Sequence, residues 1–129
     1  MAFDFPTQFR FADSHEYAVL EDGLIRIGIS AFAVDQLGDI VFVDLPDAGM
    51  HLEKGSAFGS VESVKAVEDI FSPVSGEVLK VNSSVLDSPE ELQNDPHDKG
   101  WLLVLKPSDV SDLDSLMDSE TYSKKVSSQ

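Results

Sequence analysis

The dipeptide Asp22-Gly23 is the feature that most constrains the fold of this chain. It lies between two strand-like runs in the segment EYAVLEDGLIRIGI, residues 16–29. Asp-Gly is favoured in the two-residue type I′ turn, because both central residues of that turn need positive φ. The segment therefore predicts two antiparallel strands joined by a tight turn.

Further short elements follow this hairpin. Ser30 can cap a short helix over 31–37, and Gly38 is suited to the residue that follows its end. The run GDIVFVDLP (38–46) predicts a strand that ends at its proline. The run GWLLVLKP (100–107) is almost continuously apolar, as expected for a strand covered on both faces. The chain is therefore predicted to be mainly β.

The segment VESVKAVEDIF (61–71) can be interpreted in two ways. Valine or isoleucine recurs at every third position, a spacing that would suit a helix. The β-branched content, the glycines before the segment and the Ser72-Pro73 break after it favour strands instead. We predict two strands that meet at a tight turn, with Lys65 near the tip.

A weak internal repeat supports a two-sheet arrangement. GDIVFV (38–43) and GEVLKV (76–81) share a glycine, an acid and apolar residues at the same offsets. Matching strands on both sides of the 61–71 hairpin would suit a β-sandwich with approximate two-fold symmetry. The alternative is a coincidence between short β-rich strings.

Two helix signals lie toward the C-terminus. In SPEE (88–91), Ser88 is predicted as an N-cap, with Pro89 at the first helical position. A longer helix is predicted over about 109–125, with acids early and two lysines late, as the helix dipole favours. Its apolar residues at helical spacing are Val110, Leu113, Leu116 and Met117.

The composition limits the classes of partner that this chain can bind. With 24 acidic and 9 basic residues the net charge is −15 at pH 7, so phosphate-bearing partners such as nucleic acid and anionic membranes would be repelled. There is no cysteine, which excludes a disulfide scaffold and a thiolate nucleophile. No leader and no long apolar run is evident, so we expect one cytoplasmic, monomeric domain spanning 1–129.

Motifs for self-sufficient catalysis are missing. His15, His51 and His97 are far apart and lack metal-ligand spacing, and no phosphate-binding glycine motif occurs. His15 and Glu16 are adjacent, and adjacent side chains on a strand point to opposite faces. We therefore expect a protein that is not itself an enzyme.

Lys65 is the residue best suited to chemistry. Its acidic neighbours Glu62, Glu68 and Asp69 favour the ammonium form, so it is badly placed as a nucleophile. A lysine at a hairpin tip between small residues is instead well placed for a modifying enzyme. Such a lysine is typical of carrier proteins.

Five segments together resemble the H proteins of the glycine cleavage system, a family of lipoyl carriers, over nearly the whole chain. Tyr17 stands where that family more commonly has tryptophan, which could alter the packing beside His15. The matching segments are SHEY (14–17), IGISAFAVDQLGDIVFVDLPDAG (27–49), GSAFGSVESVKAVEDIFSPVSGEVLKVN (55–82), NDPHDKGWL (94–102) and LMDSETYSKKV (116–126).

The resemblance implies a barrel-sandwich hybrid of two small antiparallel sheets, with a few short helices and a C-terminal helix. It implies lipoate attached through an amide bond to Lys65 by lipoate-attachment enzymes. The lipoyl group would accept an aminomethyl group from a pyridoxal-phosphate glycine decarboxylase and deliver it to a tetrahydrofolate-dependent aminomethyltransferase. A dihydrolipoyl dehydrogenase would then reoxidise it.

The family shelters its loaded arm against the protein surface, and nearby carboxylates would favour an amine there. The candidates for this cleft are Glu16, Asp69 and His15, although Asp69 could equally be a solvated turn acid. Glu62 and Ser63 are the candidates for recognition by the lipoylating enzymes.

Other carriers and one non-carrier remain as alternatives. Biotin carriers usually place the modified lysine between methionines, whereas Val64 and Ala66 flank Lys65 here. Lipoyl domains of 2-oxo acid dehydrogenases usually have aspartate before the lysine. A relay carrier for lipoyl or octanoyl groups fits the same residues. An unmodified acidic interaction module would leave Lys65 as an ordinary surface lysine.

Overall fold

The turn at Asp22-Gly23 forms as the sequence predicts. The computed structural model describes residues 4–127, and within it β2 (Glu16–Glu21) and β3 (Leu24–Ile29) pair antiparallel from Glu16↔Ile29 to Glu21↔Leu24. The φ angles are 54° at Asp22 and 79° at Gly23, as a type I′ turn requires.

This hairpin forms the middle of a seven-stranded antiparallel sheet with the order β10-β1-β2-β3-β9-β8-β5. The chain therefore brings its C-terminal segment back beside its N-terminal strand. The predicted strand within 100–107 is confirmed, and its buried residues pair with β3 and β8. The bounds are β1 (Arg10–Phe11), β5 (His51–Leu52), β8 (Gly76–Val81), β9 (Leu103–Pro107) and β10 (Met117–Asp118).

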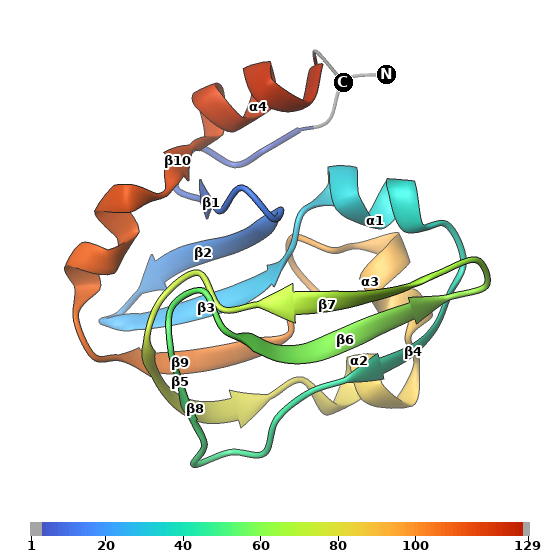
Figure 1. Ribbon diagram of the computed structural model, residues 1–129, viewed down its shortest axis with the longest axis horizontal. Helices are drawn as coiled ribbons and strands as arrows, with labels where there is room; N and C mark the ends of the chain where they lie inside the picture. Colours follow the sequence, from blue (N-terminus) through green and yellow to red (C-terminus); the bar gives the residue numbers. More distant parts are fainter. Residues whose placement is uncertain (1–3, 128–129) are drawn as a thin grey trace.

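A second, three-stranded antiparallel sheet lies across the first (Figure 1). It consists of β4 (Ile40–Asp44), β6 (Ala57–Ser63) and β7 (Val67–Phe71), in the order β4-β6-β7. The prediction of two antiparallel sheets is thus confirmed, although one sheet is larger than expected. The repeated segments form β4 and β8, one in each sheet; the two-fold symmetry stays a prediction.

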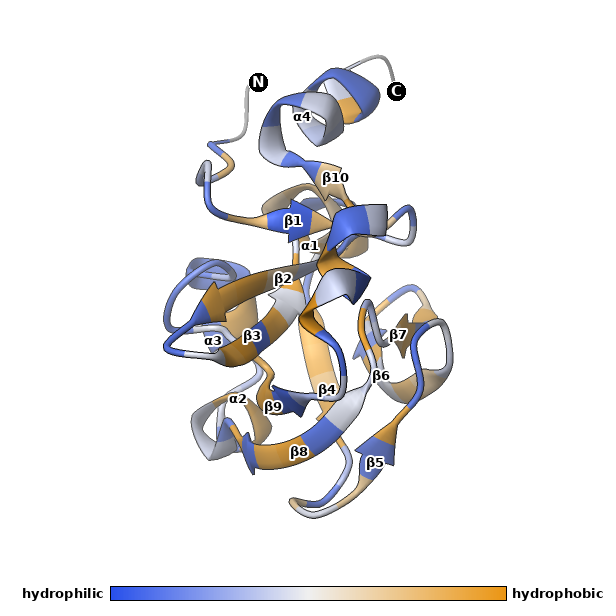
Figure 2. Cartoon of the chain, turned by 90° about the vertical axis from the view of Figure 1, so that its left-hand side faces the viewer, coloured by the Kyte–Doolittle hydropathy of each residue, from blue (hydrophilic) through white to orange (hydrophobic). Residues whose placement is uncertain are grey.

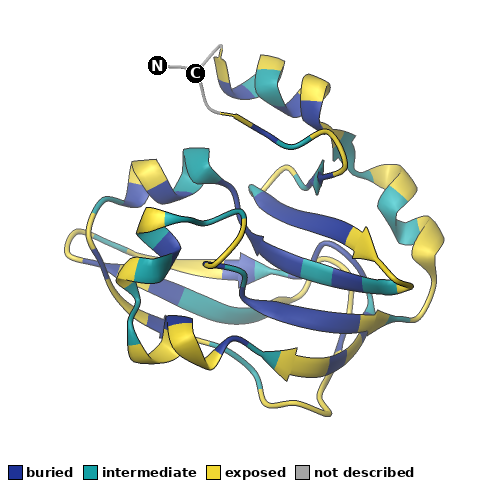
Figure 3. Ribbon diagram, turned by 180° about the vertical axis from the view of Figure 1, so that it is seen from behind, coloured by how far each residue is buried: buried dark blue, intermediate teal, exposed yellow. Residues whose placement is uncertain are grey.

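The core lies between the two sheets and includes buried residues of the short helices. In Figure 3 buried ribbon runs along much of the larger sheet, and exposed residues lie on the loops, on the outer sides of the helices and on parts of β4, β7 and β8. Apolar stretches in Figure 2 run along the same strands. A separate, mainly aromatic cluster packs the C-terminal helix onto β1 and β2: Phe5, Phe9, Phe11, Tyr17, Val19, Tyr122 and Val126.

The short helix after the hairpin has the predicted ends. α1 (Ala31–Leu37) begins after Ser30, whose hydroxyl accepts a hydrogen bond from the Ala33 N–H at 3.2 Å. Gly38 follows it with φ 78°. The cap predicted at Ser88 is wrong: Ser88 ends α2 (Ser83–Asp87), and its side chain makes no capping bond to α3 (Glu90–Asn94).

The predicted helix over 109–125 is also wrong in its first half. Val110–Ser115 forms a 3₁₀ helix, Met117–Asp118 forms β10, and only Ser119–Ser127 forms the C-terminal helix α4. The short polar side chains explain the interruption, because they bond to nearby backbone and compete with a regular helix. Asp109 caps the Ser111 N–H at 3.0 Å, and Asp112 accepts from the Ser75 N–H at 3.0 Å.

Candidate functional site

Lys65 lies in the tight turn between β6 and β7, as predicted. Ser63, on the β6 side, closes this turn through its backbone N–H, which donates to the Ala66 carbonyl at 2.8 Å. Its hydroxyl accepts from the N–H groups of Ala66 and Lys65, at 3.1 and 3.3 Å. Ser63 is only 4% exposed, so its side chain is buried within the turn and stabilises it.

The tip of the hairpin is fixed while its side chains point outward. The Val64 N–H donates to the Asp39 carbonyl at 3.0 Å, which ties the turn to the residue before β4. The flanking Val64 and Val67 are 71% and 63% exposed. Lys65 lies between them, and it takes part in none of the ion pairs found between residues 4 and 127. The structure therefore presents the amine of Lys65 on a rigid support.

A groove of about 760 Å³ begins at this lysine and runs between β7, the start of β2 and α1. Among its described lining residues, Lys65 is the only lysine or arginine, and four carboxylates share the groove with it. The lining thus combines apolar walls with negative charge. The apolar residues are Ile29, Phe32, Ala33, Leu37, Val61, Ala66, Ile70 and Phe71, and the carboxylates are Asp13, Glu16, Glu68 and Asp69.

Glu16 is the buried acid of this groove. It is 3% exposed, and its Oε2 accepts a hydrogen bond from the Phe71 N–H at 2.9 Å. The Ser14 hydroxyl donates to the other carboxylate oxygen. Burial raises the pKa of Glu16 above its ordinary value, and the Phe71 N–H opposes this by stabilising the charge. A carboxylate offers about four acceptor positions, so it retains capacity for a further donor.

His15 enters the same groove from the residue before β2. Its φ is 83°, a left-handed conformation that breaks the strand's alternation. The expectation that His15 and Glu16 face opposite sides is therefore wrong, since both line the groove. Burial, helped by the positive charge of Lys125, lowers the pKa of His15 below its ordinary value.

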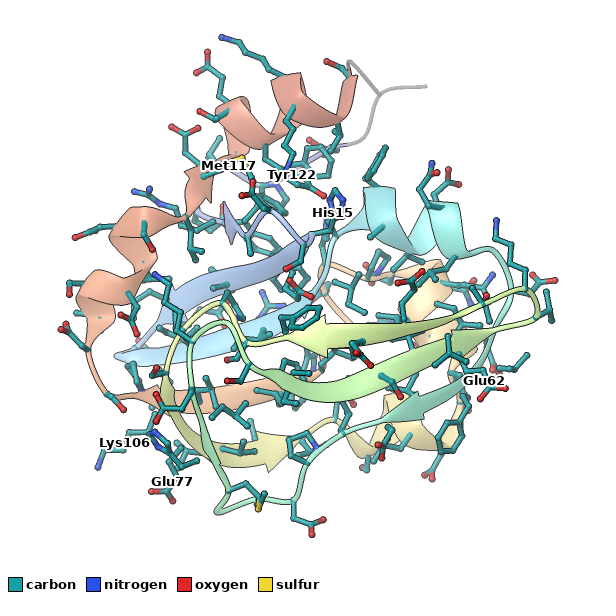
Figure 4. The ribbon with its side chains drawn as sticks, viewed as in Figure 1. His15, Glu62, Glu77, Lys106, Met117 and Tyr122 are labelled. Atoms are coloured by element: carbon teal, nitrogen blue, oxygen red, sulfur yellow. The ribbon has the colours of Figure 1, made fainter. Side chains whose placement is uncertain are left out.

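Tyr122 and Ser30 extend this site, and the sequence reasoning missed both. The Tyr122 hydroxyl lies 2.7 Å from His15 Nδ1 and 2.6 Å from Ser30 Oγ. Figure 4 shows Tyr122 of α4 and His15 close together between α4 and α1. Burial raises the pKa of Tyr122 to about 12. No local pattern links these positions, because they meet only when β10 pairs with β1.

The other predicted residues lie in distinct places. Asp69 is exposed at the groove, whereas Glu62 is exposed on β6 outside it, opposite Phe42 and Val67 in register (Figure 4). Tyr17 does not line the groove. It is fully buried on the other side of β2, where its hydroxyl donates to the Pro96 carbonyl at 2.8 Å. The tyrosine that replaces the family's more common tryptophan therefore packs away from the groove.

The remaining histidines have separate environments. His97 Nε2 accepts a hydrogen bond from the Ala31 N–H at 3.0 Å, which holds the first residue of α1. His51 is exposed and lies 3.0 Å from Glu53. The described residues contain no group of three side chains that could hold a metal ion. No helix among them is long and apolar enough to cross a membrane.

These residues fit a long covalent arm with a polar end. The amine at the tip supplies an attachment point, the apolar walls suit an alkyl chain, and Glu16 offers a buried acceptor for a donor at its end. The two sheets and the lysine at the β6–β7 tip define a protein with a lipoyl-domain-like fold.

Comparison with known proteins identifies the family. The family model for the glycine cleavage H-protein matches residues 9–129. A glycine cleavage system H protein of Prochlorococcus marinus is 73% identical over 100% of both chains. One from Synechococcus sp. strain CC9902 is 70% identical over 98% of both. The crystal structure of the H protein from Mycobacterium marinum matches with a TM-score of 0.89 and 32% identity, covering 95% of this chain and 99% of that one. The chain belongs to the glycine cleavage H-protein family.

Proposed function

We propose that this protein is the lipoyl-bearing carrier of glycine cleavage, with lipoate in an amide bond to the Nζ of Lys65. The observation that carries the proposal is the placement of a lysine at a hairpin tip, at the end of a groove that contains a buried carboxylate. The protein supplies position, and the chemistry belongs to the cofactor. It is therefore a cosubstrate of other enzymes.

Bound at Lys65, lipoate would supply a disulfide that accepts the aminomethyl group of glycine as carbon dioxide leaves: the S–S bond breaks, one sulfur bonds to the carbon and the other takes up a proton as a thiol. The donor enzyme is a pyridoxal-phosphate glycine decarboxylase and the acceptor is a tetrahydrofolate-dependent aminomethyltransferase. Dihydrolipoyl dehydrogenase restores the disulfide. Tethering raises the effective concentration of the reacting group at each of these enzymes.

The groove residues have a separate part in this proposal. Glu16 accepts a hydrogen bond from an amino group at the end of the arm, and the apolar walls keep bulk water away from it. Asp69 adds a second carboxylate at the exposed side of the groove. Both acids favour the cationic form of an amine, so the loaded arm is held while the carrier moves between enzymes.

The attachment enzymes would contact the protein at the turn around Lys65. Glu62 is exposed on β6 next to the turn, and we assign it to recognition by these enzymes. Ser63 supports the same event by shaping the turn that presents Lys65. With a net charge of −15, the carrier is suited to basic docking patches on its partner enzymes rather than to nucleic acid or anionic membranes. We place it in the cytoplasm as a monomer.

Reconstitution tests this function. The chain lipoylated in vitro is mixed with glycine, tetrahydrofolate, NAD⁺ and the three enzymes, and glycine-dependent release of carbon dioxide is followed. We expect release with the wild-type chain and with Lys106→Arg, which changes an exposed lysine of β9 far from the tip. Lys65→Arg is expected to abolish it.

Two outcomes would contradict the proposal. One is unchanged release with Lys65→Arg. The other is a lipoylated chain that passes lipoyl groups to acceptor proteins but supports no glycine cleavage, which would make it the relay carrier instead.

A further inference from the structure

Three side chains from distant parts of the sequence form one hydrogen-bonded chain behind the groove. Ser30 Oγ lies 2.6 Å from the Tyr122 hydroxyl, which in turn lies 2.7 Å from His15 Nδ1. Ser30 and Tyr122 are both fully buried, at 0% exposure. Water therefore cannot satisfy their hydroxyl protons, and each proton needs a protein acceptor.

The direction of this chain follows from the bond that Ser30 already makes. Its oxygen accepts from the Ala33 N–H, as the N-cap of α1. If Tyr122 donated to Ser30, the Ser30 proton would have no acceptor among the contacts of its oxygen. If Ser30 donates to Tyr122, the tyrosine proton passes on to His15 Nδ1 and every donor is satisfied.

We infer that Ser30 and Tyr122 are positioning residues that fix neutral His15 with its proton on Nε2. His15 Nδ1 is then the acceptor at the end of the chain. Nε2 makes no hydrogen bond with any residue in the described range 4–127, while the imidazole lines the groove. The site thus contains an N–H donor beside the Glu16 carboxylate, an acceptor.

By this inference the C-terminal helix supports the groove from behind, through Tyr122 and His15. Tyr122 lies on α4, and α4 is anchored by buried Tyr122 and Val126 and by the 2.9 Å ion pair between Lys125 and Asp13. A ligand end that combines a donor with an acceptor, such as an amide or an amine beside sulfur, fits the pair of His15 and Glu16. This use of the donor rests on the proposed function, whereas the tautomer itself does not.

The test uses the unmodified full-length chain, so it is independent of lipoylation. Nitrogen-15 NMR of the histidine side chains at pH 8 distinguishes a protonated ring nitrogen from an unprotonated one. We expect His15 to carry its proton on Nε2, with Nδ1 shifted by the hydrogen bond from Tyr122. Tyr122→Phe is expected to change the Nδ1 resonance and to introduce the other tautomer.

Tyr17→Phe is the matched control, because it removes a buried hydroxyl that bonds to Pro96 on the other side of β2. It is expected to leave the His15 resonances unchanged. Thermal unfolding of both variants separates a lost fold from a changed tautomer. His15 with its proton on Nδ1 in the wild type would overturn the inference. Identical His15 resonances in the wild type and in folded Tyr122→Phe would overturn it too. Absence of lipoylation would instead contradict the proposed function and would not affect this inference.

Discussion

The carboxylate of Glu16 accepts a hydrogen bond from the backbone N–H of Phe71 at 2.9 Å and so joins the two sheets inside the groove. Glu16 begins β2 of the seven-stranded sheet, and Phe71 ends β7 of the three-stranded one. One buried side chain therefore has two tasks. It supports the fold, and it supplies the acceptor that the proposed function needs.

Substitution of Glu16 separates these tasks. Glu16→Gln keeps an oxygen for the Phe71 N–H and removes a buried charge, so the free energy of unfolding is expected to change by less than about 1 kcal/mol. Glu16→Ala leaves that N–H without its acceptor and is expected to cost about 1–3 kcal/mol. Urea unfolding checks both values. Equal losses in the two variants would contradict the assigned hydrogen bond.

The same two variants report on the arm. Both lose the negative charge, so in the lipoylated, aminomethyl-loaded protein both are expected to expose the arm and to speed loss of the amine to water. The rate of that loss, measured by NMR of the loaded protein, is the readout. Asp69→Asn, at the exposed side of the groove, is expected to have a smaller effect because solvent screens its charge.

Ser63 and Glu62 are expected to affect lipoylation for different reasons. Ser63→Ala removes the acceptor for two turn N–H groups and is expected to lower the free energy of unfolding by about 1 kcal/mol as well as the lipoylation rate. Glu62→Gln alters only an exposed side chain and is expected to slow lipoylation at unchanged stability. Rates with a purified attachment enzyme and urea unfolding check this. A slower Ser63→Ala with undiminished stability would favour direct recognition of its hydroxyl.

Gly28 is expected to tolerate no side chain, because the ring of its cross-strand partner Tyr17 covers it. A Cβ at Gly28 would clash with Cζ and the hydroxyl of Tyr17. Since Tyr17 is fully buried, Gly28→Ala is expected to cost about 1–3 kcal/mol through overpacking. A melting temperature equal to that of the wild type would contradict this packing.

His97 makes stability depend on pH. Burial lowers its pKa from the ordinary value of 6.5, and its Nε2 can accept the Ala31 N–H only while unprotonated. The unfolded chain therefore binds more protons than the native one below about pH 7, so stability falls as the pH drops through 6.5 toward the native pKa. Asp4, Asp95 and Arg26 also act on this imidazole, and the two acids raise its pKa.

The matched variants are His97→Gln and His51→Gln, since His51 is exposed. We expect urea midpoints between pH 8 and 5.5 to flatten in the first variant and to follow the wild type in the second. His15, whose pKa is also lowered, contributes in the same direction, whereas the raised pKa of Glu16 opposes it in more acidic solution. Parallel curves for all three proteins would contradict the assigned role of His97.

Local signals were enough for much of the fold. The Asp22-Gly23 turn, the cap at Ser30 and the Lys65 hairpin each depend on neighbouring residues, and all three were predicted correctly. The prediction of one helix over 109–125 was wrong, because helical spacing of apolar residues does not reveal the competition from short polar side chains. The prediction of Ser88 as an N-cap was wrong, because Ser88 is the C-cap of α2.

The site could be predicted only in part, because local signals do not show which distant residues the fold brings together. Lys65 was singled out by its charged neighbours, and Glu16 by its place in a matching segment. The contact of Tyr122 with Ser30 could not be predicted, because it spans 92 residues and depends on the pairing of β10 with β1. The burial of Ser63 was missed because the sequence does not show which way its hydroxyl points.

The central claim is that Lys65 carries lipoate, and the intact mass of the protein from its native cells tests it most directly. Peptide mapping of residues 55–80 then locates any modification. We predict a lipoyl increment on Lys65 that is absent in Lys65→Arg. An unmodified Lys65, in cells that lipoylate other proteins, or a biotin increment at this position would contradict the account.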